Sequence, residues 1–277
     1  MTSITVVVDN QPGLEGLTPE WGLALWIEHQ DQAILYDTGM GPALLPNLAA
    51  LGLDPARLAA VVISHGHLDH MGGLGPLLQA RGGEPLPVWC HVGTFEAHYK
   101  QEADGSLKDI GPPLGGRAPY EDLGAHFKFV DVYAHPWPGV HLLAPIPRVV
   151  SHEEPAPGLV TLLGPAVVPD PVTEDLVVVI QSGSGPLVLT ACAHAGPANI
   201  LEHVRQVMAA PVAWLIGGLH LDTATPLHRQ NSLAYLVNRQ GLRLAVGHCT
   251  GPRSQAALAQ ALGARLTPLS LGLRLEF

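Results

Sequence analysis

The sequence has few of the residues that build disulfide frameworks, nucleic-acid surfaces or membrane spans. It has 3 cysteines in 277 residues, too few for a disulfide framework and ordinary for a reducing compartment. It has 14 Lys and Arg against 24 Asp and Glu, a formal charge of −10, so the clustered cations that bind phosphates are missing. No apolar run approaches the roughly 18 residues that cross a bilayer, and the start lacks a signal-peptide core. We therefore expect a cytoplasmic protein without a nucleic-acid or membrane partner, and the sequence leaves its oligomeric state open.

Glycine, proline and histidine are abundant instead. The 31 Gly and 26 Pro predict many tight turns, and a hydrophobic fraction of 47% is typical of a globular protein rather than a disordered one. The 15 histidines outnumber Lys and Arg together. Because histidine is the commonest metal ligand and carries protons near neutral pH, the places where histidines cluster are candidate sites of chemistry.

The order of the expected elements predicts an α/β fold in a single domain, residues 1–277. No repeat, linker or charge block divides the chain. Strands dominate first and alternate with helices later, which favours a four-layer α/β/β/α sandwich of two mixed sheets with outer helices. Residues 102–120 lack a sustained apolar period and are expected to be a long loop, a lid or an insertion. The expected strands are 4–8, 23–28, 32–36, 61–64, 127–130, 140–144, 176–180, 187–190, 212–216, 242–246 and 271–275, and the expected helices are 42–51, 72–80, 94–100, 197–208, 226–239 and 253–262.

Four potential metal ligands lie within six residues, directly after the expected strand 61–64. They are His65, His67, Asp69 and His70. A lone histidine is more often a satisfied or exposed polar group, but this density of donors predicts a metal site. Imidazole together with carboxylate suits one or two ions of Zn²⁺, with Mn²⁺ or Fe as alternatives, rather than Ca²⁺, which prefers oxygen ligands alone.

The pattern His65-x-His67-x-Asp69-His70 after a hydrophobic strand resembles the signature of the metallo-β-lactamase superfamily. The upstream element Asp37-Thr38-Gly39 resembles that superfamily as well. The resemblance implies the same α/β/β/α sandwich and the hydrolysis of esters, lactones, phosphodiesters or thioesters. It also implies that Asp37 braces the metal loop from behind and is not itself a ligand.

Further segments resemble one branch of this superfamily. The branch consists of metal-dependent hydrolases and includes archaeal 7,8-dihydropterin-6-methyl-4-(β-D-ribofuranosyl)aminobenzene-5′-phosphate synthase. Because that synthase name is carried by relatives whose substrates are undetermined, the resemblance indicates the family better than the reaction. The segments that carry it are Val8-Asp9-Asn10, Glu20-Trp21-Gly22-Leu23, 64–67, 190–196, 217–221 and 247–251.

The same resemblance assigns two further metal ligands, His194 and His248. Where the superfamily usually has a bridging Asp, this chain has Cys192. Either His194 completes the first metal site, with Cys192 as a thiolate bridge or a buried bystander, or the site holds one ion. His220 is either a further ligand or an acid that contacts the substrate. Cys249 is expected to point away from His248 into the core, since neighbours at a strand end face opposite sides.

These residues predict a hydrolase that uses a metal-bound hydroxide on a phosphoester or a cyclic ester or lactone small molecule. Asp69 would orient the hydroxide and accept its proton, and His220 would stabilise charge or protonate the leaving group. The candidate substrate contacts are Glu20, Trp21 and Arg148.

Two alternatives remain open at this point. The chain could be a condensing enzyme similar to the dihydropterin synthase, or a metal-containing sensor that binds a small molecule without turning it over. A serine hydrolase is excluded, because the sequence has no G-x-S-x-G elbow.

Overall fold

The computed structural model describes residues 1–277, which form two compact units that interleave along the chain. Unit 1 contains Met1–His98, Asp109–Asp131 and Leu269–Phe277, and unit 2 contains Tyr99–Lys108 and Val132–Pro268. The expectation of a single domain over the whole chain stays a prediction.

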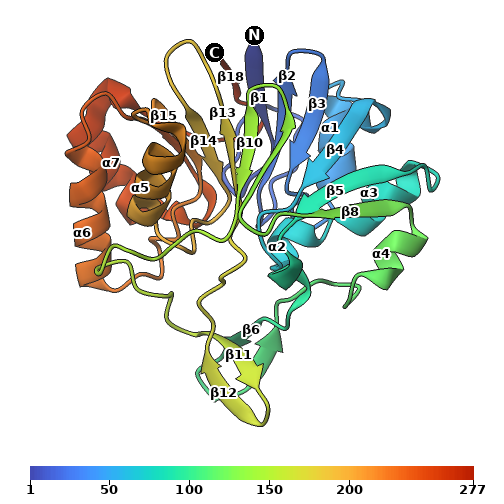
Figure 1. The fold of residues 1–277 in the computed structure, drawn as a ribbon, viewed down its shortest axis with the longest axis horizontal. Helices are drawn as coiled ribbons and strands as arrows, with labels where there is room; N and C mark the ends of the chain where they lie inside the picture. The colour runs from blue at the N-terminus through green and yellow to red at the C-terminus, as the bar shows by residue number, and fades with distance from the viewer. The chain divides into compact units, whose positions relative to one another are not determined.

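Unit 1 is built on a seven-stranded mixed sheet of order β18-β1-β2-β3-β4-β5-β8 (Figure 1). β18, β1, β2 and β3 pair antiparallel, and β3, β4, β5 and β8 pair parallel. The strands are β1 (Thr2–Val8), β2 (Ala24–His29), β3 (Gln32–Tyr36), β4 (Leu58–Val62), β5 (Leu86–Cys90), β8 (Ala125–Phe129) and β18 (Arg274–Glu276), and the helices are α1 (Leu44–Ala50), α2 (Leu68–Met71), α3 (Leu74–Ala80) and α4 (Ala118–Asp122), with 3₁₀ turns at Pro55–Arg57 and Val92–Phe95.

Alternation along the strands of unit 1 explains its helix-covered core. Ala24 and Trp26 of β2 point to the same face and pack with Leu44 and Leu48 of α1 in one apolar cluster. Leu44 and Leu48 are four residues apart, so they lie on one side of their helix. The core of this unit therefore lies between its sheet and its helices.

Unit 2 repeats this design with a second seven-stranded sheet, of order β17-β16-β15-β14-β13-β10-β9. β14 to β17 are parallel, and β9, β10 and β13 are antiparallel to their neighbours. Each of its three helices begins with a proline, a residue favoured at the first helical position, and α5 and α7 both contact α6 (Figure 1). The elements are β9 (Tyr133–Trp137), β10 (Val140–Leu143), β13 (Val177–Ile180), β14 (Leu187–Thr190), β15 (Trp214–Gly217), β16 (Arg243–Val246), β17 (Leu266–Pro268), α5 (Pro197–Met208), α6 (Pro226–Val237) and α7 (Pro252–Leu262), with 3₁₀ turns at His248–Thr250 and Gly263–Arg265.

A third, four-stranded sheet of order β12-β11-β6-β7 corrects two expectations. It contains β6 (Tyr99–Gln101), β7 (Leu107–Asp109), β11 (Leu159–Leu163) and β12 (Ala166–Pro169). The predicted helix 94–100 is wrong, because the chain turns at Val92–Phe95 and then pairs with β11, a partner too distant in sequence for local periodicity to reveal. The predicted loop 102–120 contains β7 and the start of α4 instead, and its role as a lid stays a prediction.

The predicted fold class is confirmed. Mixed sheets with helices on one face occur in both units, and α5 occupies residues 197–208 as its apolar period and leading proline predict. None of the helices is both long and apolar enough to span a bilayer.

Candidate metal centre

The four ligands predicted from the motif converge in unit 1. His67 is the N-cap residue of the short helix α2, which places Asp69 and His70 in its single turn. Nε2 of His65 lies 3.0 Å from Nδ1 of His67, and Nε2 of His70 lies 3.6 Å from Oδ2 of Asp69. The three histidines are buried, whereas the side chain of Asp69 keeps 18% of its surface exposed.

Asp37 sits behind this cluster and determines which ring nitrogens carry protons. Its carboxylate accepts hydrogen bonds from the backbone N–H and the hydroxyl of Ser64, both at 2.7 Å, and lies 2.8 Å from Nδ1 of His70. The single hydroxyl proton of Ser64 is therefore used, so Nδ1 of His65, 2.8 Å from that oxygen, must donate to it. Both histidines then carry their proton on Nδ1, which leaves Nε2 as a lone pair for a metal ion.

The donor set in unit 1 fits a divalent metal ion. Metal–nitrogen bonds of roughly 2.0–2.1 Å place two tetrahedral nitrogen ligands about 3.3 Å apart, close to the separation of the His65 and His67 nitrogens. The neighbouring carboxylate of Asp69 adds an oxygen donor and a negative charge. These residues therefore offer the nitrogen and oxygen donors that divalent transition metals bind.

Gly66 is required between the first two histidines. A Cβ at this position would lie 2.3 Å from the carbonyl oxygen of Thr94 and 2.7 Å from Nε2 of His98. The His98 ring is buried, with its centroid 5.1 Å from that of His67. His98 is not among the residues predicted from the sequence, because it lies in a segment expected to be helical, far from the motif.

In unit 2, three loops follow the parallel strands β14, β15 and β16. The carboxyl ends of parallel strands meet at one edge of a sheet, and this edge is where open α/β sheets place ligands. Ala193, His220 and His248 have φ angles of +56°, +48° and +47°. Such left-handed backbone is costly for residues other than glycine, and it gathers at functional sites.

These loops bring Cys192, His220 and Cys249 together. Their sulfur and ring-nitrogen atoms all lie within 4.8 Å of one another, and the His220 backbone N–H lies 3.3 Å from the Cys249 sulfur, to which it donates. The ring of His194 lies beside that of His220, with centroids 4.4 Å apart. Burial alone would raise the pKa of the Cys249 thiol, but its hydrogen bond with Cys192 and the nearby His248 and His220 hold that pKa well below its usual range.

The prediction that Cys249 points away into the core is therefore wrong. Strand alternation does not apply, because β16 ends at Val246 and His248–Thr250 forms a 3₁₀ turn that begins with left-handed backbone. A Cβ placed on Gly218 would lie 2.6 Å from the Cys249 sulfur and 3.3 Å from a His248 ring carbon, so both side chains approach the same glycine.

The partly buried Arg148 holds the loop that carries Cys192 and His194. Arg148 donates to the carbonyl oxygens of His194, Pro171 and Glu153 at 2.6, 2.7 and 3.2 Å. Burial lowers the pKa of Arg148, although the charges of Asp175 and Glu153 oppose the shift. The guanidinium is thus engaged with the backbone, and its predicted contact with a substrate stays a prediction.

The remaining candidate substrate contacts lie in unit 1. The carboxylate of Glu20 accepts hydrogen bonds from the backbone N–H groups of Gly41 and Ala43 at 3.1 and 3.0 Å, which fixes the turn before α1. The side chain of Trp21 is 49% exposed. Their roles toward a substrate stay predictions.

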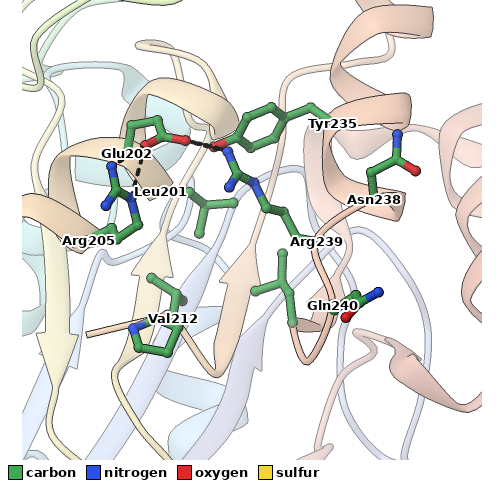
Figure 2. Close-up of a pocket in the computed structure, with 10 residues that line it drawn as sticks. Leu201, Glu202, Arg205, Val212, Tyr235, Asn238, Arg239 and Gln240 are labelled. Carbon is green, nitrogen blue, oxygen red and sulfur yellow. Dashed lines mark hydrogen bonds and ion pairs between the residues drawn. The ribbon is translucent and has the colours of Figure 1, made fainter. Parts of the chain in front are cut away.

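Two hollows in unit 2 differ in their chemistry. One, of about 10 Å³, has room for about one water molecule and is lined by His194, His220 and His228 among others. The other, of about 290 Å³, lies between α5 and α6, and its Glu202 pairs with Arg205, Arg239 and the Tyr235 hydroxyl (Figure 2). Glu202, Arg205 and Arg239 already pair with one another and no metal-type cluster borders this second hollow, so only the first hollow adjoins candidate ligands.

The chain belongs to the metallo-β-lactamase superfamily, whose family model matches residues 18–248. This match includes both the His65–His70 motif and His248. It agrees with the fold of mixed sheets and helices and with the grouping of histidine, aspartate and cysteine side chains in the two units.

Among its relatives is 7,8-dihydropterin-6-methyl-4-(β-D-ribofuranosyl)-aminobenzene-5′-phosphate synthase of Methanocaldococcus jannaschii. The two are 24% identical over 251 residues, which cover 86% of this chain and 84% of the relative. The similarity to this branch of the superfamily, which the sequence motifs predicted, is thereby confirmed.

Solved structures show the same fold. Tm1679, described as a metal-dependent hydrolase of the β-lactamase superfamily, aligns with a TM-score of 0.84 at 23% identity, covering 100% of this chain and 99% of that one. A diphosphatase from the PhnP family aligns with a TM-score of 0.58 at 16% identity, covering 100% and 97%.

Proposed function

We propose that this protein is a metal-dependent hydrolase that acts on a phosphoester or a cyclic ester of a small molecule. One observation carries the proposal: Asp37 and Ser64 fix the protons of His65 and His70 on Nδ1, so that both Nε2 atoms can act as metal ligands beside the Asp69 carboxylate. Such preorganisation of ligand tautomers is typical of metal sites rather than of ordinary buried histidines.

His65, His67, Asp69 and His70 would hold the ion, and the superfamily resemblance supports His194 and His248 as further ligands. A divalent ion supplies a Lewis acid that polarises a carbonyl or phosphoryl oxygen and makes bound water acidic. Asp69 is the partly exposed member of its cluster, so its carboxylate can orient the attacking water and accept its proton.

The test compares the wild type with His67→Ala and Asp69→Ala, using elemental mass spectrometry and a panel of phosphoesters and lactones. We expect both variants to lose metal and activity while keeping the fold, as judged by circular dichroism. His126→Ala is the matched control, because His126 is an exposed histidine of the same unit. Unchanged metal content in both variants would contradict the proposal.

A second candidate function is condensation similar to that of the dihydropterin synthase, favoured by the 24% identical relative that spans most of this chain. The discriminating assay supplies an activated dihydropterin and a ribofuranosyl-aminobenzene phosphate and measures the joined product by mass. A joined product that requires both substrates would favour the synthase. Turnover of single esters without any joined product would favour the hydrolase.

A further inference from the structure

The chain contains three cysteines, and two of them meet in unit 2 although 57 residues separate them in sequence. Cys192 and Cys249 are both buried, with 3% and 5% of their surface exposed. The hydrolytic mechanism proposed above uses neither thiol. Their convergence beside an imidazole therefore calls for its own explanation.

We propose that Cys192, Cys249 and His220 form a thiolate–imidazole binding site for a zinc-type metal ion within unit 2. The two sulfurs and a ring nitrogen of His220 lie within 4.8 Å of one another. Zinc–sulfur bonds of roughly 2.3 Å and zinc–nitrogen bonds of roughly 2.0–2.1 Å place tetrahedral ligands about 3.3–3.8 Å apart, so small side-chain movements complete the site. Two thiolates and one imidazole with a fourth, open position form a known ligand set of catalytic zinc.

The surroundings of the three side chains favour a metal ion over plain apolar packing. The Nδ1 atom of His220 is buried and lacks a hydrogen-bond partner, which is unusual for a buried polar atom. The His220 backbone N–H points at the Cys249 sulfur from 3.3 Å, a contact that stabilises a negative sulfur. His220 and His248, which carry or directly precede these groups, both have left-handed backbone, a costly conformation that gathers at functional sites.

Glycine at position 218 makes room for the Cys249 sulfur. A Cβ there would lie 2.6 Å from that sulfur and 2.4 Å from the carbonyl oxygen of Ala191. The close approach of backbone and thiol therefore depends on the second glycine of the Gly217-Gly218 pair. When an ion binds, each thiol loses its proton to solvent and forms a metal–sulfur bond.

The third cysteine provides a matched control. Cys90 is a buried residue of β5 in unit 1, where burial raises the pKa of its thiol to about 12. It has the surroundings of an inert structural thiol. Cys90→Ala should leave the proposed site intact.

The experiment adds Co²⁺ to reduced, chelator-treated protein and records the thiolate-to-cobalt charge-transfer band in the near ultraviolet. We expect the band in the wild type, in Cys90→Ala and in His67→Ala, weaker in Cys192→Ser and in Cys249→Ser, and absent from the double variant. A band that is insensitive to Cys249→Ser would overturn the site as proposed. So would cobalt that binds to the wild type without any such band.

A second measurement needs no variant, which covers the case in which a cysteine variant does not fold. X-ray absorption of the zinc-loaded wild type should contain a sulfur shell at roughly 2.3 Å. A shell of nitrogen and oxygen alone would overturn the inference. The hydrolase proposal fails separately, through unchanged metal content in His67→Ala and Asp69→Ala, so the two failures are distinguishable.

Discussion

At the scale of single residues, one carboxylate controls two imidazoles. Asp37 bonds to His70 directly and to His65 through the Ser64 hydroxyl. Its own backbone has a φ of +59°, a strained conformation that the surrounding hydrogen bonds maintain. This arrangement agrees with the predicted bracing role of Asp37 beside the candidate ligands.

Replacement of Asp37 by Ala should weaken metal binding by roughly 10–100-fold, the range found when partners of metal ligands are removed. The physical reason is that His65 and His70 would no longer be held with Nε2 unprotonated. Affinity is measured by competition with a chromophoric chelator. Asp54→Ala is the control, because Asp54 accepts only a local N–H in an exposed turn. Equal affinities for the Asp37→Ala variant and the wild type would contradict the bracing role.

The convergence of the candidate ligands of unit 1 could be predicted from the sequence because these residues are local. Four donors in six residues converge in any loop that turns back on itself, and Asp37 follows a recognisable strand. Cys249 could not be predicted, because its direction depends on a left-handed residue at position 248 and on room above Gly218. His98 was also missed, since its neighbour Gly66 belongs to a different part of the sequence.

At the scale of elements, the start of α5 supports the loop that carries Cys192 and His194. Glu153 accepts hydrogen bonds from the N–H groups of Ala198 and Asn199 in the first turn of this helix, and from the Ser232 hydroxyl of α6. Burial raises the pKa of this carboxyl, although its three donors oppose the shift. Glu153 thus joins two helices beneath the loop.

Glu153→Ala should lower the free energy of unfolding by roughly 1–3 kcal/mol, the cost of leaving buried donors without an acceptor. Urea denaturation followed by circular dichroism measures this loss. Glu154→Ala, at the exposed neighbouring position, should change stability by less than about 0.5 kcal/mol. Equal effects of the two substitutions would show that Glu153 does not support α5.

Elements with strong local signals were predicted well, and elements defined by distant partners were not. α5 has an initial proline and an amphipathic period, and its bounds match the prediction. β6 and β11 are defined by their pairing across more than fifty residues, so the apolar residues near position 95 suggested a helix instead.

At the scale of the whole molecule, buried and half-buried histidines make stability depend on pH. Burial lowers the pKa of His141 and of His203, and His135 adds to the shift at His141. At pH values between the lowered pKa of the folded state and the ordinary pKa of about 6.5, the unfolded chain binds more protons than the folded chain. The stability that these groups contribute is therefore present above about pH 6.5 and is lost as the pH falls.

We expect the free energy of unfolding of the chelator-treated protein to decrease from about pH 7 to about pH 5.5. His203→Gln should make this decrease smaller, because it removes one group that binds a proton more readily in the unfolded chain than in the folded chain. Urea titrations at several pH values measure the slope, and His126→Gln serves as the exposed control. A slope that His203→Gln leaves unchanged would contradict the assignment.

The terminal strand β18 pairs with β1, so the two ends of the described chain are neighbours in the sheet of unit 1. During synthesis on the ribosome, the other strands of this sheet emerge long before residues 269–277. The open edge of β1 then presents unpaired N–H and C=O groups to any other nascent chain for as long as unit 2 is being translated. Pairing of β18 covers this edge, so a chain interrupted before residue 274 would leave β1 as an exposed, aggregation-prone edge strand.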